Sequence, residues 1–194
     1  MLSQIRPAIV STILFTLLLG VGYPLVVTGI AKVAFPFQAE GSLIRDSGGK
    51  VIGSALIGQA FAKPEYLHPR PSAAGNGYDA SNSSGSNYGP LNTDMAKRIK
   101  GDADAIRASG ISEVTEDSVT TSASGLDPHI SPTYAMLQVD RIAKTRGASA
   151  DEVRKVISDH VEGQWLGFIG QPRVNVLQTN LALDAAFAKG QPKA

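Results

Sequence analysis

The chain contains no cysteine, a single tryptophan and three histidines among its 194 residues. The absence of cysteine excludes disulfide bonds and metal sites built from thiolates. The histidines His68, His129 and His160 follow no ligand spacing such as H-x-x-x-H, so the sequence predicts no metal site. The 18 basic and 17 acidic side chains nearly balance, and no basic stripe is present. This distribution argues against a nucleic-acid-binding protein.

Charge is also absent between Arg6 and Lys32. The apolar run within this interval, Ala8–Ala31, is long enough as a helix to cross the ~30 Å hydrocarbon core of a bilayer. A cleaved signal peptide, for which Gly29-Ile30-Ala31 would be the cleavage site, has a shorter apolar core of roughly 7–15 residues. We therefore predict a transmembrane anchor over residues 1–34 and one soluble domain over residues 35–194.

Small residues and a proline interrupt the anchor at Gly20, Gly22 and Pro24. They favour either close packing against other membrane helices or a simple tether with a mild kink, and the sequence leaves both open. Arg6 lies on one side of the span and Lys32 on the other. The positive-inside tendency then favours a cytoplasmic N-terminus and an extracytoplasmic soluble domain.

The soluble part mixes patterns typical of strands and helices, which predicts an α+β fold. A hairpin is expected in Ser42–Gly58, around the turn Asp46-Ser47-Gly48-Gly49. Ile111–Thr121 is expected to be strand-like or irregular, and Arg173–Thr179 to be a short strand. Helices are expected over Leu91–Ser109 with Asn92 or Thr93 as its cap, over Pro132–Arg146, after the capping box of Ser149 and Glu152, and over Leu181–Lys189 with Asn180 as its cap.

A long Gly/Ser/Asn-rich loop, Arg70–Pro90, shows neither helical nor strand periodicity. Loops of this length are functional or disordered, and we interpret this one as an ordered recognition loop. Successive backbone N–H groups in glycine-rich turns can bind an anion. Gly75, Gly77, Gly85 and Ser86 are therefore the candidates for contact with a nucleotide, although no Walker A loop is present.

Asp127 and His129 raise the alternative of a membrane-anchored hydrolase or binding domain. The chain has no G-x-S-x-G nucleophile elbow. A catalytic triad is also a spatial arrangement, which two neighbouring residues do not establish. We therefore assign no catalytic residue.

Several long strings resemble one family in order along the chain. RPSAAGNGYDASNSSGSNYGP (Arg70–Pro90), SGLDPHISP (Ser124–Pro132) and LGFIGQPRVNVLQTNLALD (Leu166–Asp184), with GSALIGQAF (Gly53–Phe61), are similar to the C subunit of the bacterial Kdp-type potassium-transporting ATPase. The resemblance includes the single N-terminal span and covers the chain except for its C-terminal tail.

The resemblance implies an accessory, non-pore subunit of a high-affinity potassium uptake pump in the bacterial inner membrane. Its implied partners are a potassium-conducting subunit and a P-type ATPase subunit that hydrolyses ATP through a phosphorylated aspartate. The C subunit is described as a catalytic chaperone that raises ATP affinity, so ATP is expected through the complex and not as a firmly bound cofactor. The residues expected to contact partners are Arg70, Tyr78, Asp79, Asn87, Tyr88, Asp127 and His129.

Overall fold

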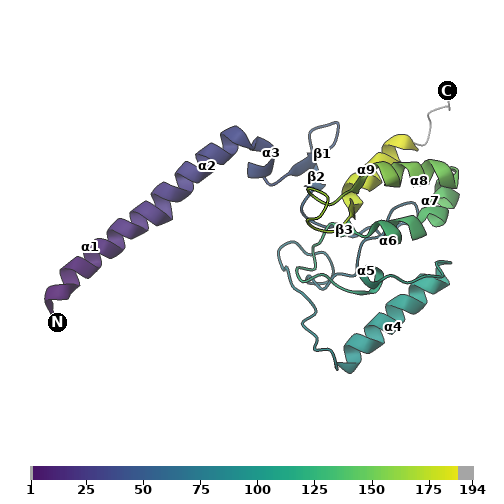
Figure 1. Cartoon of the computed structure of the whole chain (residues 1–194), viewed down its shortest axis with the longest axis horizontal. Helices are drawn as coiled ribbons and strands as arrows, with labels where there is room; N and C mark the ends of the chain where they lie inside the picture. Colours follow the sequence, from purple (N-terminus) through teal and green to yellow (C-terminus); the bar gives the residue numbers. More distant parts are fainter. Residues whose placement is uncertain (1, 188–194) are drawn as a thin grey trace. The chain divides into compact units, whose positions relative to one another are not determined.

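The computed structural model describes residues 2–187, and the contacts within the chain divide it into two compact units, Met1–Ser54 and Ala55–Ala194. The first unit consists of helical and hairpin elements, of which Figure 1 labels the α-helices and the strands. They are a 3₁₀ turn (Leu2–Gln4), α1 (Ile5–Phe15), a π-helical segment (Thr16–Gly22), α2 (Tyr23–Ala34), α3 (Pro36–Ala39), β1 (Leu43–Arg45) and β2 (Val51–Ser54).

The N-terminal helix extends from Ile5 to Ala34, and its 30 residues are long and apolar enough to cross a membrane. This confirms the predicted N-terminal apolar helix. Pro24 has no N–H to donate, and a local π segment is one way in which a helix bonds the backbone groups that a proline frees. Just before the proline, the Tyr23 N–H donates to the Leu18 carbonyl, one residue further back than in an α-helix.

The predicted hairpin is confirmed, with β1 and β2 paired antiparallel. One Asp46 carboxylate oxygen accepts the N–H groups of Gly48 and Lys50, both at 2.9 Å. Gly49 has a φ of +80°. An aspartate that bonds its own turn and a glycine at positive φ together explain why the chain reverses here.

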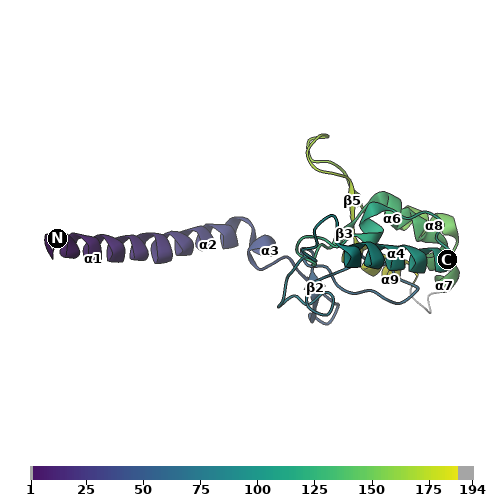
Figure 2. The same ribbon diagram turned by 90° about the horizontal axis from the view of Figure 1, so that it is seen from below.

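The second unit combines helices with a small antiparallel sheet, in the strand order β3-β5-β4. The predicted α+β class is confirmed. Figures 1 and 2 show α6–α9 gathered beside the sheet. The elements are α4 (Thr93–Ala108), α5 (Glu116–Val119), β3 (His129–Ile130), α6 (Pro132–Leu137), α7 (Val139–Arg146), α8 (Ala150–Asp159), β4 (Val161–Glu162), β5 (Arg173–Asn175) and α9 (Val176–Ala186).

The core lies where α6–α9 pack against β5. Apolar side chains from these helices recur at helical spacing, and each helix buries one face against the others. The central buried residues are Leu67, Ile130, Tyr134, Ala135, Val139, Ile142, Ala143, Val153, Ile157, Val174, Val176 and Leu183.

Several predicted helix ends are confirmed. The Asn92 side chain accepts the N–H groups of Asp94 and Met95 at the start of α4. Both bonds of the capping box between Ser149 and Glu152 are present at the start of α8. Gly147, with a φ of +66°, ends α7 in the left-handed conformation that favours glycine.

The helix expected over residues 132–146 is wrong in one respect, because it is divided into α6 and α7 at Gln138. The Gln138 side chain is fully buried. Its amide oxygen accepts the His68 N–H at 2.8 Å, and its amide nitrogen donates to the His68 carbonyl at 3.2 Å. Residues 111–121, expected to be strand-like or irregular, contain the short helix α5.

The strand expected over residues 173–179 is correct only as far as Asn175, because α9 begins at Val176. Asn175 caps this helix by accepting the Gln178 N–H at 3.1 Å. Asn180, the expected cap, is instead buried inside the helix. The expected end of this helix at Lys189, and the tail after Gly190, lie outside the described residues.

Asn180 pairs with a segment that belongs to no regular element. Its amide oxygen accepts the Leu67 N–H at 2.7 Å, and its amide nitrogen donates to the Leu67 carbonyl at 3.1 Å. Together with the Gln138 pairing to His68, this bonds the N–H and carbonyl groups of two consecutive residues, which in a sheet would need a strand on each side. Side-chain amides therefore fix the chain immediately before residue 70.

Replacing Asn180 by alanine is expected to lower the free energy of unfolding by about 2–4 kcal/mol, because two buried backbone groups of Leu67 lose their partners. The measurement is urea denaturation of the full chain in detergent, followed by circular dichroism. Gln178→Ala, on the same helix at a half-buried position, should change stability by less than about 1 kcal/mol. Equal effects of the two variants would contradict this role of Asn180.

Candidate partner-binding site

Residues 70–90 and 122–131 pack against each other along their backbones. The Ser84 N–H donates to the Ser124 carbonyl at 3.0 Å, and the Ser72 hydroxyl donates to the Gly125 carbonyl at 2.6 Å. A Cβ on Gly85 would lie 2.9 Å from the Ala123 carbonyl oxygen. Glycine is required at this point because a side chain would separate the two loops. Two loops that are far apart along the chain therefore form one surface.

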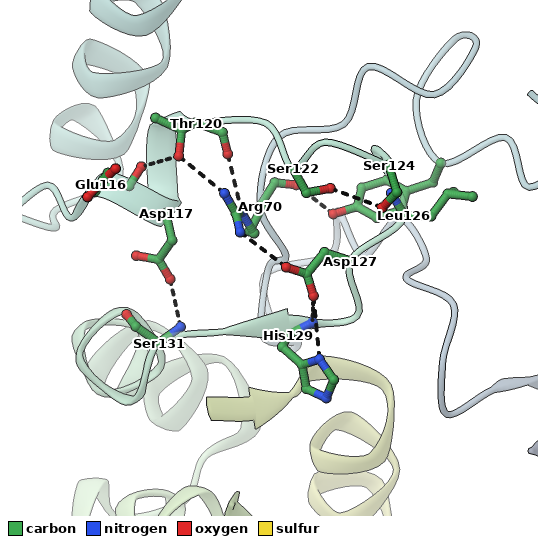
Figure 3. A network of polar contacts seen from close by, with 11 residues as sticks. Arg70, Glu116, Asp117, Thr120, Ser122, Ser124, Leu126, Asp127, His129 and Ser131 are labelled. Carbon is green, nitrogen blue, oxygen red and sulfur yellow. Dashed lines mark hydrogen bonds and ion pairs between the residues drawn. The ribbon is translucent and has the colours of Figure 1, made fainter. Parts of the chain in front are cut away.

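Arg70, Asp127 and His129 lie together at the junction of these loops (Figure 3). The Arg70 guanidinium donates to the Asp127 carboxylate at 3.1 Å. The other Asp127 oxygen accepts the His129 N–H at 2.9 Å and lies 3.4 Å from His129 Nδ1. Asp127 thus connects the start of one loop to the strand that ends the other.

The pKa of the Asp127 carboxyl is lowered from its usual value. Burial acts in the opposite direction, but the hydrogen bonds from His129 and the positive charge of Arg70 outweigh it. The carboxylate is therefore charged at neutral pH and holds the junction together.

The half-buried Tyr78 side chain holds the Arg70 backbone in place. Its hydroxyl donates to the Arg70 carbonyl at 2.6 Å, and its N–H donates to the Ser72 hydroxyl at 2.8 Å. Burial, and then the negative charge of Asp127, raise the pKa of the Tyr78 hydroxyl. Tyr78 also has a φ of +57°, which is uncommon for a bulky side chain. Its polar groups are thus bonded within the loop, while its ring lies against Gly58, where a Cβ would come within 2.8 Å of the Tyr78 ring.

Asp79, Asn87 and Tyr88 are exposed instead. One Asp79 oxygen accepts the N–H and the hydroxyl of Ser81, and these bonds lower the pKa of the Asp79 carboxyl. Asn87 has a φ of +53°, and the Tyr88 side chain is 43% exposed. These residues present polar and aromatic groups to the surroundings of the loop.

A cleft of about 780 Å³ opens beside the junction. Both signs of charge line it, so it has no strong preference for a cation or an anion. The lining residues are Arg70, Thr115, Glu116, Asp117, Thr120, Asp127, His129, Ile130, Ser131, Thr133, Gln171, Pro172 and Arg173.

The nucleotide candidates do not all meet in one place. Gly75, Gly85 and Ser86 line a cleft that also contains Arg98, whereas Gly77 lines a different cleft. The Arg98 guanidinium in the first cleft is already paired with Asp102 at 2.9 Å. This pairing offsets the attraction that a phosphate would feel.

Sequence reasoning missed Thr120 and Asp117, which complete the junction. The Thr120 carbonyl and hydroxyl each accept a hydrogen bond from Arg70 at 3.3 Å. The Asp117 carboxylate accepts the Ser131 N–H at 2.6 Å (Figure 3). Both residues lie on or next to α5, a single helical turn whose sequence pattern is too short to show helical periodicity.

Comparison with known proteins gives one consistent result. A family model described as the c chain of the K⁺-transporting ATPase, KdpC, matches residues 5–185. The chain is 63% identical over 193 residues to the potassium-transporting ATPase KdpC subunit of Caulobacter sp. (strain K31), with 98% of each chain covered. It is 57% identical to the KdpC subunit of Beijerinckia indica, covering 99% of this chain and 98% of the relative. It is 50% identical to that of Geobacter metallireducens, covering 94% and 98%.

The junction predicts a pH dependence. Because the folded pKa of Asp127 lies below its usual value, its ionised form stabilises the fold at neutral pH, and this contribution is lost as the pH falls through the folded pKa. The native chain should therefore be more stable than Asp127→Asn at pH 7. The difference should shrink below about pH 4.

The measurement is urea denaturation of both full-length chains across this pH range. Asp151→Asn, where the side chain is 92% exposed, should leave stability within about 0.5 kcal/mol of the native value at each pH. A difference between native and Asp127→Asn chains that stayed constant with pH would rule out the charge as its source.

Proposed function

This chain belongs to the KdpC family, the c chain of the K⁺-transporting ATPases, and on that premise we propose that it is a membrane-anchored docking subunit of the pump. The proposed soluble domain, residues 35–194, lies outside the cytoplasm and binds the outer face of the potassium-conducting subunit. The observation that carries this proposal is the joining of residues 70–90 and 122–131 into one ordered surface, supported by the Arg70–Asp127 ion pair.

The predicted contact residues fall into two groups, one that holds the loops together and one that is exposed to a partner. Arg70, Tyr78 and Asp127 use their polar groups within the junction, so their main role is to hold its shape. Asp79, Asn87 and Tyr88 are exposed and remain available to a partner. His129 belongs to both groups, because it contacts Asp127 within the junction and also lines the cleft.

The proposed orientation separates this surface from ATP. With the N-terminus in the cytoplasm, the second unit and the nucleotide lie on opposite sides of the membrane. Any effect on the ATP affinity of the ATPase subunit then passes through the membrane helices, as a coupling free energy between distant sites. We therefore propose an indirect chaperone role in which the chain itself makes and breaks no covalent bond.

The orientation is tested with Ser109→Cys, because Ser109 is exposed and the native chain has no cysteine. We expect a membrane-impermeant maleimide to label the variant in intact spheroplasts. Labelling only after lysis would place the domain in the cytoplasm and make direct help with ATP binding the better mechanism. Native chain, which has no thiol, controls for background labelling.

The docking surface is tested with Asp79→Ala combined with Tyr88→Ala, which avoids the internal contacts of Tyr78. Truncating an aromatic anchor such as Tyr88 in an interface can cost more than 1 kcal/mol, so we expect about a tenfold loss in retention of the chain by the affinity-purified pump. Potassium-stimulated ATPase activity should fall in parallel.

The matched control is Asp151→Ala with Lys155→Ala on the exposed face of α8. This pair should assemble like the native chain. Native-level retention and activity of the Asp79/Tyr88 variant would reject the loop as the docking surface.

A further inference from the structure

The connection between β4 and β5 exposes an unusual apolar tip. Residues 163–172 carry no charged side chain. Figure 2 shows this connection, in yellow-green beside β5, projecting away from the rest of its unit. The exposed fractions at its tip are 68% for Trp165, 67% for Leu166, 73% for Phe168 and 45% for Ile169. Contiguous exposed apolar groups of this kind mark interaction sites.

Hydrogen bonds give this tip a defined shape. Trp165 and Ile169 exchange two backbone bonds of 2.9 Å. The Gln164 side chain donates to the Gly170 carbonyl at 2.8 Å. At the base, Arg173 and Glu162 form an ion pair of 2.8 Å across the strands. The apolar side chains are thus displayed on a closed hairpin.

The turn also holds Leu166 at a φ of +52°, followed by Gly167 at +79°. A bulky non-glycine residue pays a conformational cost in this left-handed region. The conformation turns the Leu166 and Phe168 side chains outward at the tip, where both remain largely exposed. The strained turn and the apolar side chains exposed to water are both unfavourable in the isolated chain. A partner that covers the tip would remove the apolar side chains from water and so regain that part of the free energy.

We propose that this tip inserts into an apolar pocket on the water-exposed surface of another subunit of the pump. The inference rests on the proposed function and adds a second contact to it. Tryptophan and phenylalanine dominate the energetics of protein interfaces when a pocket buries them. The tip offers both within four residues, on a backbone that is already ordered.

Two observations favour a protein pocket over the lipid surface. Loops and helices that bind anionic bilayers combine apolar groups with lysine or arginine, and residues 163–172 contain neither. A fluid bilayer also does not require the fixed, strained turn that the hairpin adopts. A fitted pocket does, because its walls select one shape.

Continuity with the candidate site gives a third argument. Gln171, Pro172 and Arg173 at the hairpin base line the same cleft as Arg70 and Asp127. A partner that covers the junction of the loops therefore reaches the base of the hairpin without a gap. One partner subunit can engage both.

The test uses Leu166→Cys, which keeps both aromatic anchors and introduces the only cysteine of the chain. A maleimide–polyethylene glycol reagent is applied to the isolated full-length chain and to the assembled pump, both in nanodiscs of phosphatidylcholine and phosphatidylglycerol. We expect labelling of this chain to be about tenfold or more slower in the pump, as for a thiol that spends most of its time covered. The control, Ser109→Cys, should be labelled at similar rates in both.

Equal labelling of Leu166→Cys in the two samples would overturn the inference while leaving the proposed function intact, since the chain still co-purifies. Protection already present in isolated chain would also overturn it, because lipid or a second copy would then cover the tip. Failure of native chain to co-purify with the pump would instead reject the proposed function itself.

Photocrosslinking identifies the occupant. With p-benzoylphenylalanine in place of Phe168, an adduct to another pump subunit supports the inference. An adduct exclusively to lipid or to a second copy of this chain contradicts it. Incorporation at Ser109 should give no subunit adduct.

Discussion

Two buried amide side chains determine where the functional surface of this protein forms. Asn180 bonds the N–H and carbonyl of Leu67, and Gln138 bonds those of His68, in place of neighbouring strands. Residue 70, where the long loop begins, follows directly. The position of Arg70 relative to Asp127 therefore depends on Asn180 inside α9 and on Gln138 between α6 and α7, more than on the loop's own sequence.

Arginines reinforce the same segment. Arg141 donates to the carbonyls of Pro64 and Tyr66, and Arg146 donates to the Glu65 carbonyl at 2.7 Å while pairing with Asp184 at 2.8 Å. The Arg146 side chain is only 7% exposed, and its hydrogen bonds offset the cost of burying its charge. An irregular segment is thus as firmly bonded as a strand, and the loop it carries is anchored to the core.

Local signals predicted much of this fold. The apolar run, the Asp46–Gly49 turn and the Ser149–Glu152 capping box are each contained in one stretch of sequence, and all were predicted correctly. The cap of α4 was predicted as Asn92 or Thr93, and the structure shows Asn92. The pairing of Gln138 and Asn180 with a segment about 70 or more residues away was not predicted. The residues around a buried Asn or Gln in a helix look the same in the sequence as those around an exposed one, so the sequence does not reveal these pairings. Arg70 and Asp127 were each predicted as site residues, but their ion pair depends on the same long-range packing.

The exposed hairpin tip did have a signal in the sequence, namely four large apolar residues in an uncharged, glycine-flanked stretch.

The π-helical segment in the N-terminal helix has a geometric consequence. A π turn contains more residues than an α turn, so the side chains of α2 are rotated about the helix axis relative to where an unbroken α-helix would place them. The row of side chains along one face of α1 is therefore not continued on the same face of α2. Within a bilayer, a straight neighbouring helix could follow one half of this span but not both.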